Sequence, residues 1–310
     1  PGVEITTGPL GQGFANGVGM GIASAHLAAK FNKKGFPLVD SYIYCICSDG
    51  DLMEGVSYES ASLAGHLKLG NLIYLYDDNQ ITIDGSTDLA FTEDVTKRFE
   101  SCGWHVQDVA DGNDLKAIEA AIKAAQKVKD KPSIIRVHTI IGYGMPKQGT
   151  SKAHSDAPGE EAVKETKRNL GWPEDKHFYI PKEALSHYRQ AVKNGAKLEK
   201  DWNALVAKYE KANGEIGSAF KQVRSDKLPD GWEKALPSFD NVEAKATRAY
   251  SGDVINAIAD VIPQMIGGSG DLTPSNNTYI KSSLDIQAGR YEKRNIHFGI
   301  REHAMGSIMN

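Results

Sequence analysis

The sequence predicts an α/β fold built on a doubly wound, mainly parallel β-sheet with helices on both faces. Short apolar runs at residues 42–47 and 72–76 show no polar alternation, as expected for strands that are buried on both faces. Two further strands are expected at residues 105–109 and 134–139. Helical patterns separate these runs, and such alternation is typical of βαβ units and a parallel sheet.

Helices are expected between the strands and after them. In the first two thirds of the chain, apolar periodicity predicts helices at residues 56–69, 93–102, 114–128, 160–169, 182–192 and 198–212. Near the end of the chain, the pattern predicts a helix at 248–261, strands near 265–268 and 296–298, and a helix that begins at Arg301.

The 310 residues are enough for two domains. We predict one α/β domain at residues 1–225 and the start of a second at residues 246–310. Residues 226–245 contain two prolines and little periodicity, so they are expected to form an extended connection. The chain opens without Met and stops inside a helical pattern, and we therefore expect it to be a piece of a longer protein.

Composition and charge exclude some classes of function. The 36 basic and 40 acidic residues are scattered and give a net charge of -4, so no basic stripe is present for a nucleic-acid partner. No apolar stretch reaches the ~18 residues of a membrane helix. The three cysteines lie in or near apolar runs, which is typical of free thiols in a reducing compartment such as the cytosol. Enzymes and binding proteins both stay open.

Acidic and amide side chains follow two neighbouring strands. Asp49 comes directly after the first apolar run, and Asn79 follows the second. Ligands of open parallel sheets bind outside the carboxyl ends of the strands, so these side chains are expected to meet in one crevice. Their oxygens suit Mg²⁺ or Ca²⁺, with phosphate oxygens completing the shell. The alternative is that both clusters are ordinary turn residues.

The glycine-rich opening of the chain does not fit a dinucleotide site, because no strand precedes it. Gly13, Gly17, Gly21 and Ala25 recur at intervals of four residues. On a helix they form one smooth stripe, which predicts close packing against another helix.

Four segments together resemble the transketolases, a family of thiamin-diphosphate enzymes. The first is the pair of clusters itself, because Gly-Asp-Gly followed about thirty residues later by Asn is the motif that binds thiamin diphosphate in this family. Here the first glycine is replaced by Ser48. The others are GPLGQG at residues 8–13, SLAGHL at 62–67 with DNQITIDG at 78–85, and GIREHAMG at 299–306. The resemblance extends over the whole chain.

This resemblance implies a thiamin-diphosphate-binding fold. Residues 1–225 then correspond to the diphosphate-binding domain without its N-terminal part, and residues 246–310 to the start of the pyrimidine-binding domain. It also implies a Mg²⁺ or Ca²⁺ ion held by Asp49, Asn79 and the backbone carbonyl of Ile81. The other residues implied to contact the cofactor are Gly8, Pro9, Leu10, Gly50, Glu54, Asp77, Ile83, His154, Asp271 and Glu302.

Glu302 is the first catalytic residue that the resemblance implies. In the family this glutamic acid shares a proton with the pyrimidine of the cofactor, which is bound mainly by the other subunit of a homodimer. Glu54 and Glu59 are then expected to link the two cofactors across the subunit interface as a proton relay. Without the metal motif, Glu302 would be interpreted as an ordinary first-turn carboxylate of a helix.

His154, Arg248 and Ser275 are the residues implied to contact the sugar phosphate substrate. His154 lies in a glycine-rich segment, residues 142–158, which we interpret as an active-site loop; His154 is also expected to take part in catalysis. The family pattern His-Gly-Ala-Pro is one residue longer here, with Asp156 added. Arg248 would grip a phosphate through its planar guanidinium, although a structural ion pair is the alternative.

The function implied is the reversible transfer of a two-carbon ketol unit from a ketose phosphate, such as xylulose 5-phosphate, to an aldose phosphate, such as ribose 5-phosphate. This is a reaction of the pentose phosphate pathway and the Calvin cycle, located in the cytosol or a plastid. Dihydroxyacetone synthase and a non-catalytic piece that keeps the fold are the alternatives. The 310-residue chain by itself is expected to be inactive.

Overall fold

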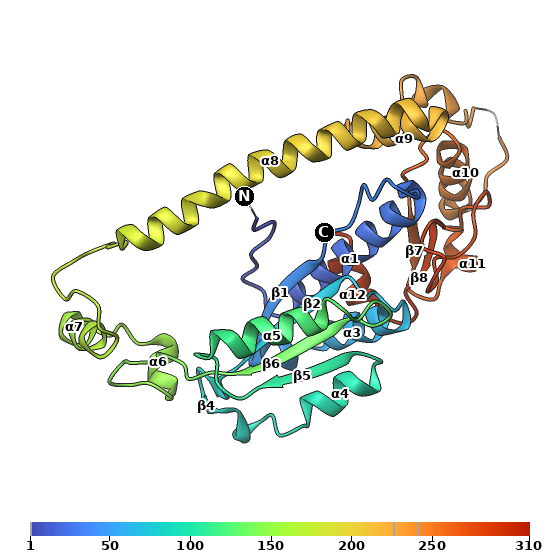
Figure 1. The fold of residues 1–310 in the computed structure, drawn as a ribbon. Helices are drawn as coiled ribbons and strands as arrows, with labels where there is room; N and C mark the ends of the chain where they lie inside the picture. Colours follow the sequence, from blue (N-terminus) through green and yellow to red (C-terminus); the bar gives the residue numbers. More distant parts are fainter. Residues whose placement is uncertain (1, 226, 241) are drawn as a thin grey trace.

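The first domain contains a four-stranded parallel sheet, which confirms the predicted α/β fold (Figure 1). The structure, a computed structural model, describes residues 2–225, 227–240 and 242–310, so the domain boundary predicted at Asp226 lies outside the described residues. The sheet has the strand order β1-β2-β6-β5. Its strands match the four predicted runs: β1 (Ile43–Ser48), β2 (Leu72–Asp78), β5 (His105–Val109) and β6 (Ser133–His138).

Helices cover both faces of this sheet, as predicted for a doubly wound layer. On one face lie α1 (Gln12–Phe31) and α3 (Gly55–His66), where the ring of Tyr74 on β2 packs 4.3 Å from that of Phe14. On the other face, Ile73 of β2 packs with α5 (Leu115–Ala125). Successive side chains of a strand point to opposite faces, so neighbouring residues of β2 serve two separate cores.

The prediction that β1 is buried on both faces is wrong. Tyr44 and Ile46 are 47% and 83% exposed, whereas Cys45 and Cys47 point toward α1 and the core. The reason is topological, because β1 is an edge strand and α5 reaches only the strands further along the sheet. An uninterrupted apolar run therefore did not distinguish an edge strand from the buried β2.

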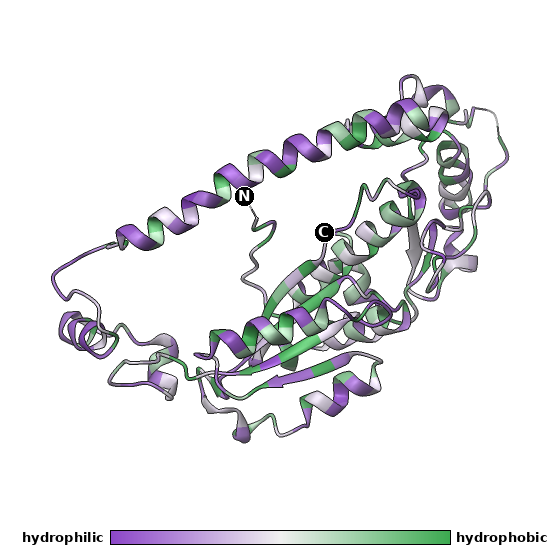
Figure 2. Cartoon of the chain, viewed as in Figure 1, coloured by the Kyte–Doolittle hydropathy of each residue, from purple (hydrophilic) through white to green (hydrophobic). Residues whose placement is uncertain are grey.

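The two helices predicted at residues 182–192 and 198–212 form one helix, α8 (Lys182–Ala212), of 31 residues. Gly195 continues the helix with ordinary backbone angles, and its surroundings are open. Figure 1 shows α8 extending along one side of the molecule, and in Figure 2 most of its surface is hydrophilic. Within the described ranges, no helix combines the length and apolar character that crossing a bilayer requires. The C-terminal part of α8 packs on Phe31 and on α9 (Gly214–Val223), a helix that was not predicted.

The remaining elements of the first domain are short. Predicted helices are found as α4 (Val95–Ser101) and α7 (Glu160–Asn169). The elements without a sequence prediction are α2 (Asp49–Met53), β3 (Ile81–Thr82), β4 (Gly85–Ser86), η1 (Thr87–Leu89), α6 (Ser151–Ser155) and η2 (Trp232–Ala235). Elements of two to five residues carry too little periodicity to be recognised from sequence alone.

The second domain joins the first through its last helix, α12 (Glu302–Ile308), which packs against α1 and α3. The Asn16 side chain donates from Nδ2 to the Ser307 carbonyl over 2.5 Å. One apolar core is therefore continuous across both domains. The other elements of the second domain are α10 (Thr247–Ala259), β7 (Gly267–Ser269), α11 (Thr273–Asn276) and β8 (Asn295–His297).

The glycine stripe of α1 packs against the sheet, so the prediction that it faces another helix is wrong. A Cβ atom at Gly17 would lie 2.3 Å from the Cys45 sulfur, and one at Gly21 would lie 2.5 Å from Leu72. The glycine that admits α12 is Gly19, which is outside the stripe. A Cβ atom there would lie 2.1 Å from the Ile308 carbonyl oxygen.

We expect Gly19→Ala to destabilise the protein by about 1–3 kcal/mol, the usual cost of forcing an extra carbon into a packed contact. Gly195→Ala is the matched control, because it is the same change in an open helical position and should stabilise by roughly 0.5–1 kcal/mol. Chemical denaturation of both variants measures the two effects. Equal free energies of unfolding would contradict the close approach of α12 to α1.

Candidate functional site

The structure brings Asp49 and the turn that contains Asn79 together at the carboxyl ends of β1 and β2. Asp49 is 2% exposed, and its Oδ2 accepts a hydrogen bond from the backbone N–H of Gln80 over 3.1 Å. Asn79 Oδ1 accepts from the backbone N–H of Ile81 over 3.1 Å, which fixes the amide within the turn. The three predicted metal ligands therefore lie within one short stretch of contacts.

Tyr76 orients the Asp49 carboxylate, and the sequence reasoning missed it. Its hydroxyl donates to Asp49 Oδ1 over 2.6 Å and lies 3.3 Å from Asp78 Oδ1. Burial raises the pKa of Asp49, and the hydrogen bond from Tyr76 opposes this rise. Burial also raises the pKa of Tyr76, helped by its hydrogen bond to Asp49. Period-two alternation could have revealed the contact, because Tyr76 and Asp78 point to one face of β2.

Asp77, on the other face of β2, is held in place by neighbours on both adjoining strands. Thr139 donates from its hydroxyl to Asp77 Oδ1, and Asn79 Nδ2 lies 3.4 Å from the same oxygen. Ser48 donates from its hydroxyl to the Asp77 carbonyl over 3.1 Å. With a φ of -130°, Ser48 needs no glycine-like backbone, so the departure from the Gly-Asp-Gly pattern is accommodated.

The turn at residues 8–10 contacts the loop after β1 through Asp51, another residue that was missed. Asp51 Oδ1 accepts from the Gly11 N–H over 2.8 Å, and its Oδ2 accepts from the Ser48 N–H over 3.0 Å. Leu10 packs on Gly50, where a Cβ atom would lie 3.1 Å from the leucine side chain. The predicted cofactor residues Gly8, Pro9 and Leu10 therefore lie at the rim of the Asp49 site, exposed to solvent.

The donor set of this site fits a hard divalent cation. It offers a buried carboxylate, an amide oxygen and a backbone carbonyl, which are the oxygen ligands that Mg²⁺ and Ca²⁺ prefer. Across the described part of the chain, no cluster of three or more His, Cys, Asp or Glu side chains could hold a metal. A cation at Asp49 would therefore need further oxygens from water or from a ligand.

Glu59 contacts the helix that begins with Glu302. Its Oε2 accepts from the Ala304 N–H over 2.9 Å, in the first turn of α12, where the helix dipole favours negative charge. Arg301 also donates to the hydroxyl of Ser62 on α3 over 3.0 Å. Glu302 itself is exposed and lies beside Gly270, where a Cβ atom would be 3.0 Å from its Cγ. Glu59 thus positions α12, whatever it contributes to proton transfer.

The other predicted residues lie around these two groups. Glu54 lies between α2 and α3 and is exposed, as is Ile83, which follows β3. His154 lies on the exposed surface of α6, which neighbours β3. The segment at 142–158 is therefore partly helical, which was not expected. Its additional Asp156 pairs with Lys147 over 3.1 Å.

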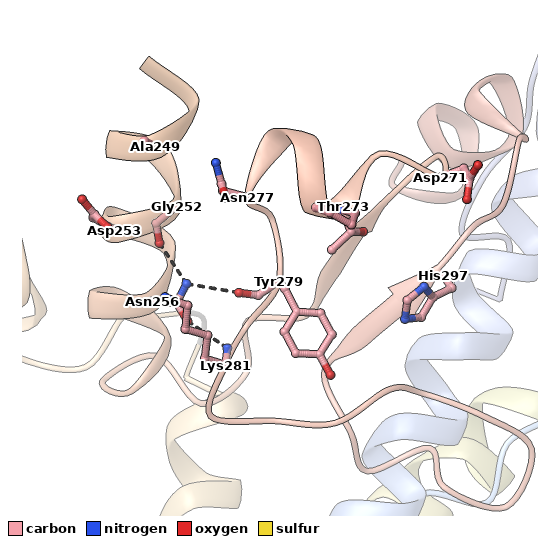
Figure 3. Close-up of a pocket in the computed structure, with 11 residues that line it drawn as sticks. Ala249, Gly252, Asp253, Asn256, Asp271, Thr273, Asn277, Tyr279, Lys281 and His297 are labelled. Atoms are coloured by element: carbon pink, nitrogen blue, oxygen red, sulfur yellow. Dashed lines mark hydrogen bonds between the residues drawn. The ribbon is translucent and has the colours of Figure 1, made fainter. Parts of the chain in front are cut away.

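A cavity of about 560 Å³ opens in the second domain (Figure 3). Asp271 lines it, with Lys281 and His297. Arg248 and Ser275 are exposed and lie one residue from lining positions, on α10 and α11. Between residues with described positions, no hydrogen bond joins this group to Asp49 or Asn79. The predicted substrate residues and the predicted metal ligands therefore belong to two separate groups in a single chain.

Family models match nearly the whole chain. Residues 1–229 match the transketolase, thiamine diphosphate binding domain, and residues 243–310 match the transketolase, pyrimidine binding domain. The chain belongs to the transketolase family. It is 56% identical to a transketolase from Nostoc and 49% identical to one from Geobacillus stearothermophilus, in each case over 100% of this chain and 46% and 47% of the relative. The chain spans about half the length of the curated transketolases it matches.

Solved transketolase structures confirm the fold. A Pichia stipitis transketolase in complex with sedoheptulose 7-phosphate superposes with a TM-score of 0.96 at 47% identity, covering 100% of this chain and 47% of that one. A Leishmania mexicana transketolase gives a TM-score of 0.96 at 44% identity over 100% of this chain and 46% of that one.

We expect Asp49→Asn to make the metal-free protein more stable than the wild type at neutral pH. The folded-state pKa of Asp49 is raised, so stability is complete below its unfolded pKa of about 3.9 and is lost as pH rises through the folded pKa. Asparagine does not titrate and avoids this loss. Melting temperatures from pH 3 to 8 in a chelator test this, and a gap between the proteins that fails to shrink in acid would contradict it.

Proposed function

We propose that the chain forms part of an enzyme that transfers a two-carbon ketol unit between sugar phosphates with thiamin diphosphate as cofactor. Membership of the transketolase family supports this, because the family model for residues 1–229 is a thiamine diphosphate binding domain. The observation that carries the proposal is the contact between the buried Asp49 carboxylate and the turn of Asn79.

In this proposal Asp49, Asn79 and the Ile81 carbonyl hold Mg²⁺ or Ca²⁺, which in turn holds the diphosphate. Asp77 and Gly50 contact the cofactor from the strand ends, and the turn at residues 8–10 lies against the thiamin. Bound thiamin diphosphate supplies the electron sink that carbon–carbon bond cleavage needs. Folding Leu10 onto Gly50 gives the turn a fixed distance from the metal loop, so that both ends of one cofactor can be held.

Glu302 acts by holding a proton at the pyrimidine of a cofactor bound to a second copy of the chain, so the active protein is a homodimer. A carboxyl group keeps a proton near neutral pH when it is desolvated. Glu302 is exposed in the single chain, and a partner that covers it would provide that desolvation. Glu54 and Glu59 then lie near the interface, where Glu59 holds α12 and thereby Glu302.

The proposed substrates are ketose and aldose phosphates, contacted by His154, Arg248, Ser275 and Asp271. Pichia stipitis transketolases have been solved in complex with fructose 6-phosphate and sedoheptulose 7-phosphate, both phosphorylated sugars. The exposed guanidinium of Arg248 is free to form the bidentate contacts that phosphates favour. We place the enzyme in the cytosol or a plastid, in sugar phosphate metabolism; a potato relative is named as chloroplastic.

Calorimetry on the 310-residue chain tests the metal site. We expect thiamin diphosphate to bind in the presence of Mg²⁺ and to bind at least tenfold more weakly in a chelator, because the diphosphate reaches the protein through the metal. Asp49→Asn should abolish the difference. A folded chain that binds the cofactor equally well with and without metal would contradict the proposal. Turnover by this chain alone is not expected, because it spans about half of its relatives.

In the native enzyme, expressed from its complete gene, Glu302→Gln should lower kcat by about 10²- to 10⁴-fold, the usual range for a lost proton-transfer group. Thiamin diphosphate affinity should change little, since the glutamine keeps the size of the side chain. Xylulose 5-phosphate and ribose 5-phosphate are the substrates for this assay. A kcat within threefold of wild type would remove Glu302 from the mechanism.

A further inference from the structure

A chain of polar contacts continues behind Asp49, away from the predicted cofactor. Tyr76 lies between Asp49 and Asp78, as described above. On the far side of Asp78, His138 at the end of β6 brings its Nδ1 to 2.9 Å from Asp78 Oδ2. The Nε2 of His138 lies 3.2 Å from Asp108 Oδ1 on β5. The contacts therefore cross the carboxyl ends of four parallel strands.

Charge compensation explains the order of these groups. Tyr76 has one proton to donate, and its shorter contact shows that Asp49 receives it. Asp78 is only 5% exposed, so its carboxylate needs another partner. His138 provides it, supported by Arg136 at 3.9 Å. Arg136 is itself held by a two-pronged contact to Asp108, at 2.9 and 2.7 Å.

Asp78 is also where the metal-binding turn begins. Its carbonyl accepts from the Thr139 N–H over 3.1 Å, and Asn79 is the next residue. Gln80 then takes a φ of +60° and directs its N–H to Asp49. Such a left-handed conformation costs energy for a residue other than glycine and persists only where neighbours hold it. Fixing Asp78 therefore fixes the position of both side-chain ligands.

We propose that Tyr76 and His138 are positioning residues for the divalent metal, Tyr76 through Asp49 and His138 through Asp78 and the turn of Asn79. This inference rests on the proposed function, because it needs a metal at Asp49. Neither residue touches the metal or the substrate in this arrangement. Groups that orient metal ligands in this way typically contribute about 10–100-fold to metal affinity.

Tyr74 provides a matched control for Tyr76. It lies two residues earlier on β2, is fully buried, and donates its hydroxyl to the Phe14 carbonyl over 2.6 Å. Tyr74→Phe and Tyr76→Phe thus remove the same atom from the same face of one strand. Both should reduce stability, but Tyr76→Phe alone should weaken Mg²⁺ binding. We expect this weakening to be about 10–100-fold when Mg²⁺ is titrated into the native enzyme at saturating thiamin diphosphate.

His138 is partly exposed, so its variants should fold even if Tyr76→Phe does not. His138→Leu should weaken Mg²⁺ binding by at least threefold, whereas His138→Asn, which returns an N–H donor near Asp78, should restore most of it. Wild-type enzyme without Mg²⁺-dependent cofactor binding would overturn the proposed function itself. Wild-type binding that Tyr76→Phe or, failing its folding, His138→Leu leaves unchanged would overturn only the positioning role. Equal losses in Tyr74→Phe and Tyr76→Phe would also overturn it.

Discussion

The burial of the Asp49 carboxylate at the end of β1 is the constraint on which the rest of the first domain depends. An ionised group removed from water needs partners that point at it, and here they come from the neighbouring strand. Parallel pairing of β1 with β2 places Ser48 opposite Asp77, so the residues after both strands emerge side by side. The packing of Tyr74 and the glycines of α1 sets the position of β1 and β2 under that helix, and this packing fixes where the buried carboxylate lies.

The second domain depends on the same region through α3. This helix follows the Asp49 loop directly, and its Glu59 and Ser62 contact the first turn of α12. At the other end of α12, Asn16 and Gly19 of α1 contact Ser307 and Ile308. Glu302 therefore has its position set by two helices of the first domain, one of which is tied to the metal loop. A displacement of that loop would be transmitted to Glu302 through one rigid helix.

The sequence predicted the strands and the convergence of Asp49 with the Asn79 turn, because both follow from local patterns and from the rule that ligands bind at strand ends. It did not predict the exposed face of β1, since an apolar run carries no information about which neighbours cover it. It also missed Tyr76, Asp51 and His138, whose roles depend on pairing between strands far apart in sequence. Asp49 and Tyr76 are separated by 27 residues, and only the strand register brings them together.

The contacts at Asp49 are better suited to a metal-bound protein than to a stable metal-free one. Two carboxylates, Asp49 and Asp78, are nearly inaccessible to solvent and share the neighbourhood of one hydroxyl, and each disfavours the charge of the other. His138 and Arg136 compensate Asp78, but among the described contacts Asp49 accepts hydrogen bonds only from neutral groups. A fold selected only for stability would replace such a buried acid with a neutral side chain. A divalent cation supplies the missing positive charge, which is why local rules of sequence and stability fail at this position and the requirement for a ligand explains it.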